Sequence, residues 1–202
     1  IGHKNAPQTI IPGKFEDSKR GCVVWDCPGF KEGTREPSYD LLNVYLKHRI
    51  IEVSRKIKFL LMMPHFFFLS RAQNAIRALE NFSNFFDDVE ELNGSLCLVI
   101  THVPSDKSVE SLRKTLLNIH NEDENINPKT RKLIKILSDR VEIFYELKEE
   151  GILEKKEYAF LPTALEKLMY YDNQTDKIEI SFPQSCLVLA WDFYEMLVIK
   201  FS

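Results

Sequence analysis

The residues best placed to do chemistry form the run Cys22-Val23-Val24-Trp25-Asp26-Cys27-Pro28-Gly29. A short apolar segment brings Asp26 to its end, and the chain then turns at Pro28-Gly29. A buried strand that ends in this way presents a carboxylate at the edge of a sheet, and glycine lets the backbone approach a ligand closely. We therefore predict a strand at residues 22–26 with Asp26 facing a ligand. An ordinary core strand that ends in a Pro-Gly turn is the alternative.

The segment Asp26-Cys27-Pro28-Gly29 resembles the Asp-x-x-Gly segment of P-loop GTPases. In that class the aspartate reaches a nucleotide-bound magnesium ion through water, and the glycine amide meets the terminal phosphate. The polar segment upstream, which ends at Thr9, resembles the switch segment whose threonine hydroxyl completes the magnesium shell. Carboxylate and hydroxyl oxygens suit this hard cation. The resemblance implies that Thr9 and Asp26 bind magnesium and that Gly29 contacts phosphate.

The phosphate-binding loop of that class, Gly-x-x-x-x-Gly-Lys-Ser/Thr, does not occur in the sequence. The pair Gly13-Lys14 is followed by Phe15, and Gln8 stands where the first glycine should be. Without the loop there are no consecutive amides and no lysine to hold the β- and γ-phosphates. Because the chain begins with Ile1, we expect it to be the remainder of a longer protein whose loop lies upstream; a real loss of the loop is the alternative. As it stands, the chain should bind GTP or ATP only weakly.

The segment from Leu98 to Pro104 falls where GTPases carry Asn/Thr-Lys-x-Asp, the motif that recognises guanine. Thr101 fits this motif, His102 replaces its lysine, and Pro104 has no acceptor to replace its aspartate. Asp106 follows two residues later and would serve only in a shifted loop. The resemblance implies that Thr101 and His102 contact the nucleotide but leaves the choice between GTP and ATP open. A strand end with a partly exposed imidazole is the alternative.

Two further segments carry weaker signals. Pro162-Thr163-Ala164 resembles the Ser-Ala loop that supports the base through backbone amides, which implies Thr163 and Ala164 as nucleotide contacts. His65 follows a predicted strand, where a histidine acts as an acid or holds a water molecule; a histidine hydrogen-bonded into the scaffold is the alternative. No nucleophile motif supports Ser-His-Asp or Cys-His catalysis.

Apolar runs and helical spacings alternate in the first half of the chain. They predict a strand at 22–26, a helix at 41–55, a strand at 57–63, a helix at 70–86 and a strand at 96–103. This order is typical of right-handed crossovers between parallel strands. We therefore predict an α/β fold, a mostly parallel sheet with helices on both faces, in which the three strands are neighbours.

The second half predicts more helix. We expect amphipathic helices at 109–119 and 129–137, a last core strand at 158–161, and a helix at 185–201; residues 141–145 alternate weakly and are not assigned. The predicted domains are a partial G-like domain at 1–170, with a helical insertion at about 106–150, and a helical extension at 171–202. Because the last helix is apolar on nearly all sides, we expect it to be buried or to pack against a protein partner, a second copy or a missing continuation of the chain.

Composition excludes some classes of function. With 44% apolar residues and a net charge of −3, the chain can bury one core but has no excess of positive charge for nucleic acid. Its four cysteines form no Cys-x-x-Cys pair, which predicts reduced thiols in an intracellular, cytoplasmic protein. The sequence contains no run of eighteen uncharged apolar residues, so no transmembrane segment is predicted.

The resemblance is to the septin-like and AIG1-like branch of the P-loop GTPases, over residues 1–105 with an echo near Pro162. It implies a guanine-nucleotide-binding switch, in which magnesium and the γ-phosphate order the segments around Thr9 and Gly29, and hydrolysis releases them. No glutamine or arginine can be assigned to the attacking water or the transition state, so hydrolysis is expected to be slow and only in the longer protein. A pseudo-GTPase interaction module without nucleotide and an unrelated α/β enzyme that uses Asp26 are the alternatives.

Overall fold

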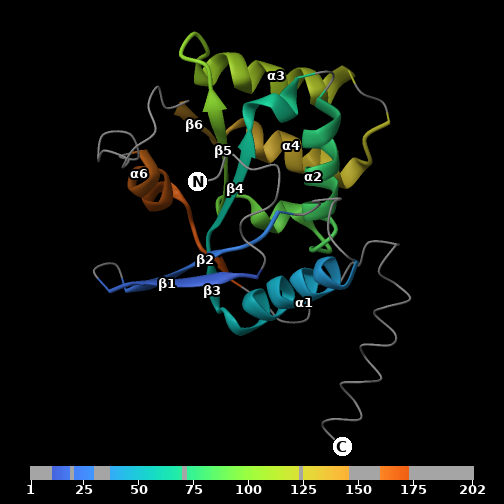
Figure 1. Cartoon of the computed structure of the whole chain (residues 1–202). Coiled ribbons are helices and arrows are strands. Elements are labelled where there is room, and N and C mark those ends of the chain that lie inside the picture. Colours follow the sequence, from blue (N-terminus) through green and yellow to red (C-terminus); the bar gives the residue numbers. More distant parts are fainter. Residues whose placement is uncertain are drawn as a thin grey trace, which may run out of the picture. The chain divides into compact units, whose positions relative to one another are not determined.

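In the computed structural model of the chain, the described residues are 11–18, 21–29, 37–69, 72–122, 125–145 and 160–172 (Figure 1). The chain divides into two compact units. The first comprises Ile1–Ser54 and Thr175–Ser202, and the second comprises Arg55–Gln174. Thr9 and the predicted helix at 185–201 lie outside the described residues.

The first unit contains an antiparallel hairpin of β1 (Gly13–Asp17) and β2 (Cys22–Asp26). The strands form a two-stranded sheet of their own, and every residue of β2 is exposed. The prediction that residues 22–26 form a buried strand in the parallel sheet is therefore wrong. The four residues between the strands can only return the chain antiparallel, and Gly21 has a φ of 61°, a conformation that glycine adopts without strain.

Helix α1 (Pro37–Val53) completes the described part of this unit. It begins four residues before the predicted helix at 41–55, with proline as its first residue, a position where the missing N–H costs no helical hydrogen bond. Its most buried apolar residues are Leu41, Val44 and Ile51, and Asn43 and Lys47 are buried beside them. Two polar side chains thus lie on the buried side of the helix.

The second unit is built on the parallel sheet β4 (Phe59–Pro64), β5 (Leu96–Val103) and β6 (Val141–Tyr145), in that order. The parallel pairing of β4 with β5 confirms the α/β prediction for these two strands, and residues 141–145 supply the third. The predicted strand at 57–63 is divided, because β3 (Lys56–Ile57) pairs antiparallel with β7 (Tyr171–Asp172) instead.

Helices flank this sheet: η1 (His65–Phe68), α2 (Gln73–Ser83), η3 (Val89–Leu92), α3 (Val109–Glu122), α4 (Pro128–Ser138) and α6 (Phe160–Lys167). Figure 1 shows α2 and α4 on one side of the sheet and α6 on the other. Cys97 and Val99 pack with Leu168, just after α6. Since side chains alternate along a strand, Leu98 and Ile100 face α2 and α4. Helices on both faces are thus confirmed for this unit.

The core of the second unit lies between the sheet and α2 and α4. The first five residues of β5 are almost fully buried, as are Leu79 of α2 and Leu133 of α4. A polar contact also crosses this core, because the hydroxyls of Ser83 and Thr130 lie 3.2 Å apart. The predicted ends of α2, α3 and α4 lie within a few residues of the observed ends.

Residues 160–172 differ from expectation. Phe160 and Leu161 belong to helix α6 and not to a last core strand. Residues 171–172 form β7 and not part of a helical extension. The domain boundary expected near residue 170 stays a prediction, since the chain after residue 172 lies outside the described part. No helix within the described ranges is long and apolar enough to cross a bilayer.

Candidate functional site

Asp26 is the last residue of β2, and its carboxylate lies at the exposed end of the hairpin. The chain leaves the strand through Cys27, the buried Pro28 and Gly29. Desolvation of its sulfur raises the pKa of the Cys27 thiol, although the residue as a whole is exposed. The nearby Lys47 charge lowers this pKa and the Asp26 charge raises it, so both charges act at Cys27.

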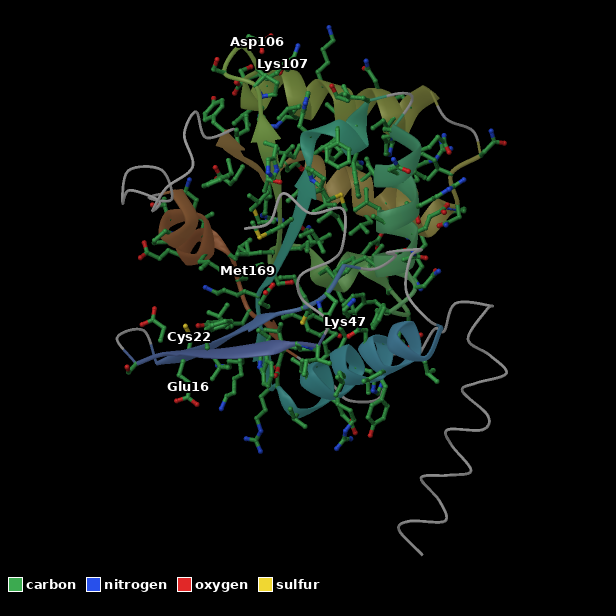
Figure 2. The ribbon with its side chains drawn as sticks, viewed as in Figure 1. Glu16, Cys22, Lys47, Asp106, Lys107 and Met169 are labelled. Carbon is green, nitrogen blue, oxygen red and sulfur yellow. The ribbon has the colours of Figure 1, made fainter. Side chains whose placement is uncertain are left out.

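The burial of Lys47 in α1 is not predicted by the sequence pattern. Lys47 is only 6% exposed, and its Nζ donates a hydrogen bond to the carbonyl oxygen of Gly29 at 3.3 Å (Figure 2). A buried ammonium group is costly unless it is hydrogen-bonded or near negative charge. Lysine within a helical pattern is usually a surface residue, so the sequence pattern does not indicate this burial.

Asn43 lies one turn before Lys47 on the same side of α1. Its Oδ1 is buried and has no hydrogen-bond partner in the part of the chain that the structure describes, and the same is true of Nδ1 of His48. Buried polar atoms are paired in most proteins. The first unit therefore places an unsatisfied oxygen acceptor on the helix face that also carries the buried ammonium group.

The second unit gathers polar residues at the carboxyl edge of its sheet. Pro64, the last residue of β4, pairs with Thr101 of β5, so His65 and His102 follow at the same edge. Between Ile100 and Val103, β5 contains a bulge relative to β6. His102 lies in this bulge with a φ of 54°, and its Nδ1 is 3.1 Å from the Thr101 hydroxyl. Bulges and positive φ at residues other than glycine cluster near functional sites.

A tight turn follows β5 at Pro104–Lys107. The Lys107 amide donates to the Pro104 carbonyl at 3.0 Å, and the Tyr145 hydroxyl donates to the Lys107 carbonyl at 3.4 Å. Figure 2 shows Asp106 and Lys107 in this turn, and their charged groups lie 3.6 Å apart. Asp106 is thus exposed at the carboxyl edge of the sheet, and a role for it in binding stays a prediction.

Thr163 and Ala164 lie inside α6 and not in a loop. Thr163 is exposed and Ala164 is buried. Amides within a helix are used by the helix itself, so the expected loop of free amides is not formed at these residues. Lys58 donates to the Leu165 carbonyl at 2.7 Å, which ties the end of α6 to the start of β4, away from the edge that carries Thr101. Nucleotide contact by Thr163 and Ala164 stays a prediction.

The carboxylate oxygens of Asp26 in the first unit are of the type that binds magnesium. Magnesium in nucleotide sites is held by one or two carboxylates together with phosphate oxygens and water, and Asp26 supplies one such carboxylate. Within the described ranges no group of three or more His, Cys, Asp or Glu residues could hold a metal without a ligand. Thr9, the other expected ligand, lies outside those ranges.

Asp26, Gly29 and Lys47 thus belong to the first unit, and His65, Thr101 and His102 belong to the second. Each unit carries one of these two groups of polar residues. No family model matches the chain, and no curated protein or solved structure is similar enough to count as a match. The likeness to P-loop GTPases is therefore carried by the sequence motifs alone.

Proposed function

We propose that the chain is part of a guanine-nucleotide-dependent switch protein with a P-loop NTPase-like fold. The observation that carries the proposal is the end of β5, where a bulge holds His102 in a left-handed conformation beside Thr101. In parallel sheets, ligands bind beyond the carboxyl ends of the strands. Backbone strain at such an edge favours a binding role for these two residues over a purely structural one.

The first unit would meet the phosphates and magnesium. Asp26 would bind the ion through water, and the Gly29 amide would meet the terminal phosphate. A phosphate at Gly29 would lie close to the Lys47 ammonium group, which already contacts the Gly29 carbonyl. An ammonium group held in a poorly hydrated place interacts strongly with an arriving anion. Lys47 would thus supply part of the positive charge that a phosphate loop normally provides.

The protein is proposed to be intracellular and cytoplasmic. Cys22, Cys27 and Cys97, the cysteines in the described ranges, are free. Burial raises the pKa of Cys97 to about 11, which keeps it a protonated core thiol. Unpaired core thiols are typical of a reducing compartment.

The proposal is tested by titrating the isotope-labelled chain with millimolar GTP and magnesium and recording amide chemical shifts. NMR detects weak binding, which is what a chain without a phosphate loop should show. We expect shifts to concentrate at Asp26–Gly29 and at Thr101–His102, and to shrink when EDTA replaces magnesium. ATP in a parallel titration tests the preference for guanine. Absence of shifts in both segments would overturn the proposal.

An interaction module without nucleotide is the second candidate, favoured by the surface of the hairpin. Phe15 of β1 is 61% exposed and its partner Val24 is 50% exposed. Apolar side chains gathered on an exposed surface mark contact sites, and a two-stranded ribbon alone is marginally stable. If GTP and ATP cause no shifts while Phe15→Ser leaves the fold unchanged and abolishes self-association seen by light scattering, this candidate replaces the switch.

A further inference from the structure

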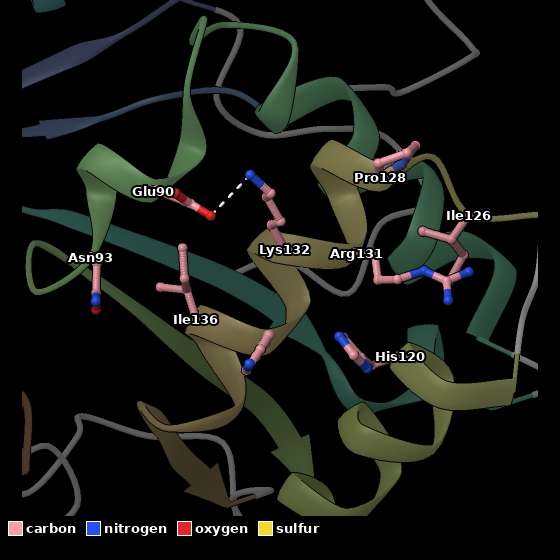
Figure 3. Close-up of a pocket in the computed structure, with 9 residues that line it drawn as sticks. Glu90, Asn93, His120, Ile126, Pro128, Arg131, Lys132 and Ile136 are labelled. Carbon is pink, nitrogen blue, oxygen red and sulfur yellow. Dashed lines mark ion pairs between the residues drawn. The ribbon is translucent and has the colours of Figure 1, made fainter.

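A cavity of about 830 Å³ lies in the second unit. It is bounded by α4, by η3 and the residue after it, by the end of α3 and by the segment before α4 (Figure 3). Asn93, which lines it, stands just before β5 begins, whereas Thr101 stands near the other end of that strand. The cavity is therefore separate from the edge proposed to bind nucleotide. Its volume is in the range of sites for small molecules.

The wall formed by α4 is strongly positive. Arg131, Lys132 and Lys135 all line the cavity at helical spacing, and His120 lines it from α3. Figure 3 shows Lys132 and His120 on different helices around the hollow. The whole chain has a net charge of −3, so this concentration of cations runs against its overall balance. Several cations around one concave space attract a multiply charged anion.

Among the described residues that line the cavity, Glu90 is the one carboxylate. Its Oε1 lies 2.9 Å from Nζ of Lys132. The hydrogen bond and the charge of Glu90 raise the pKa of Lys132, so the ammonium group stays protonated. Both side chains are more than half exposed, and exposed ion pairs are weak. An incoming anion can therefore displace Glu90 from Lys132 at little cost.

The remaining wall is apolar. Ile126 is buried, Ile136 is half-buried, and Pro128 adds the ring at the start of α4. Apolar side chains beside charged ones offer a surface on which the body of an organic ligand can pack, and a simple ion would not use this surface. The lining thus suits a molecule with phosphate groups at one end and an apolar or ring-shaped body at the other.

We propose that this cavity, the α4 pocket, binds a small phosphate-bearing ligand whose phosphates contact Lys132, Lys135 and Arg131 and displace Glu90. The ligand body packs on Ile126 and Ile136. The same phosphate chemistry occurs in soluble metabolites and in lipid headgroups, and the pocket recognises that shared group.

The first test uses inorganic pyrophosphate as the probe and calorimetry at low ionic strength. Glu90→Gln removes the competing carboxylate and should tighten binding about two- to fivefold, the range expected from an exposed ion pair. Glu91→Gln makes the same change in net charge at a neighbouring residue that does not line the pocket, and should have a smaller effect. Equal gains in the two variants would show a general charge effect and overturn the proposal.

The second test removes a cation. Lys132→Gln should weaken pyrophosphate binding about two- to fivefold, whereas Lys129→Gln, on the same helix but outside the lining, should change it less than twofold. Circular dichroism checks that both variants fold. Equal losses overturn the proposal. Amide shifts at residues 131–135 on addition of pyrophosphate test the α4 pocket, whereas shifts at Asp26–Gly29 with GTP and magnesium test the nucleotide proposal, so the two proposals fail independently.

Vesicle co-sedimentation identifies the source of the phosphate group. Phosphatidylcholine vesicles with about 5% phosphatidylinositol bisphosphate are compared with phosphatidylcholine alone. If the protein binds the vesicles that contain phosphatidylinositol bisphosphate, and this binding is lost in Lys132→Gln and kept in Lys129→Gln, the ligand is a lipid headgroup. If the protein binds pyrophosphate but not these vesicles, the ligand is a soluble molecule. If neither probe binds, the proposal is wrong.

Discussion

The Nζ atom of Lys47 donates a hydrogen bond to the carbonyl oxygen of Gly29 at 3.3 Å, although the two residues are eighteen positions apart. This contact joins helix α1 to the segment that resembles the magnesium and phosphate site of GTPases. It also places the Lys47 charge close enough to the Cys27 thiol to lower its pKa. Residues 26–29 are therefore not an isolated turn, because a buried side chain from another element contacts their backbone.

Asp26→Ala tests whether the carboxylate serves a ligand or the turn. If the carboxylate serves magnesium, magnesium-dependent GTP shifts should weaken while the melting temperature stays the same, because its removal from an exposed strand end opens no cavity. If Asp26 only caps the Pro28-Gly29 turn, the free energy of unfolding should fall by roughly 0.5–2 kcal/mol, as for lost capping bonds, with binding intact. The second result would end the nucleotide hypothesis for this residue.

Lys47→Met should raise the pKa of Cys27 further, because the ammonium charge now lowers it against desolvation. A higher pKa leaves less thiolate at a given pH, so alkylation of Cys27 by iodoacetamide should slow near neutral pH. Mass spectrometry of the peptide that contains Cys27 gives the rate. Lys47→Arg keeps the charge and serves as the control, and Cys22 should react at the same rate in all three proteins. An unchanged rate at Cys27 would show that Lys47 does not act there.

Gly94→Ala should destabilise the second unit. Gly94 has a φ of 100°, and an added Cβ would meet the terminal methyl of Met169. The methyl can move, but the backbone conformation costs a residue with Cβ about 1–3 kcal/mol. Urea denaturation should show this loss both in the wild-type background and in Met169→Ala. A loss that disappears in Met169→Ala would assign the cost to the side-chain clash instead.

Because of Cys97, the free energy of unfolding should fall as the pH rises above 9.0. Its folded pKa is raised from 9.0 to about 11 by burial, with a further rise from the Glu142 charge. A thiol with a raised folded pKa stabilises the folded state fully below the unfolded value, and this contribution is lost as pH rises through the folded value. Between pH 9.0 and about 11, the wild type should lose up to roughly 2–3 kcal/mol more than Cys97→Ala, since each pKa unit is worth about 1.4 kcal/mol. Parallel urea curves at the two ends of this range measure the difference.

The sequence predicted the second unit better than the first for physical reasons. The eight residues of β5 form a long apolar run, which is what burial on both faces requires, and the structure has this strand as expected. The five residues of β2 are too few to distinguish a parallel strand from one arm of a hairpin. Gly21 and the polar turn before it were the available signal, because parallel strands cannot be joined by so short a connection.

Other features depend on contacts that periodicity does not contain. Lys47 is buried because of where α1 packs, and the lining of the α4 pocket comes from segments that are far apart in the sequence. Pro162 directly follows the strand predicted at 158–161, yet it is the third residue of α6. Proline is tolerated in the first turn of a helix, so its presence alone did not decide between the two.

Two substitutions of His102 distinguish a role of its backbone strain from a role of its side chain. His102→Gly should leave stability unchanged or raise it by up to about 1 kcal/mol, because glycine relieves the left-handed strain but costs entropy in the unfolded chain. His102→Ala keeps the strain and should not gain stability. If the imidazole contacts the nucleotide, both variants should lose the GTP-dependent shift at Thr101. If only the shape of the bulge matters, glycine should weaken the shift and alanine should retain it. Loss of the shift in both variants, with stability preserved in His102→Gly, would assign the imidazole itself to binding.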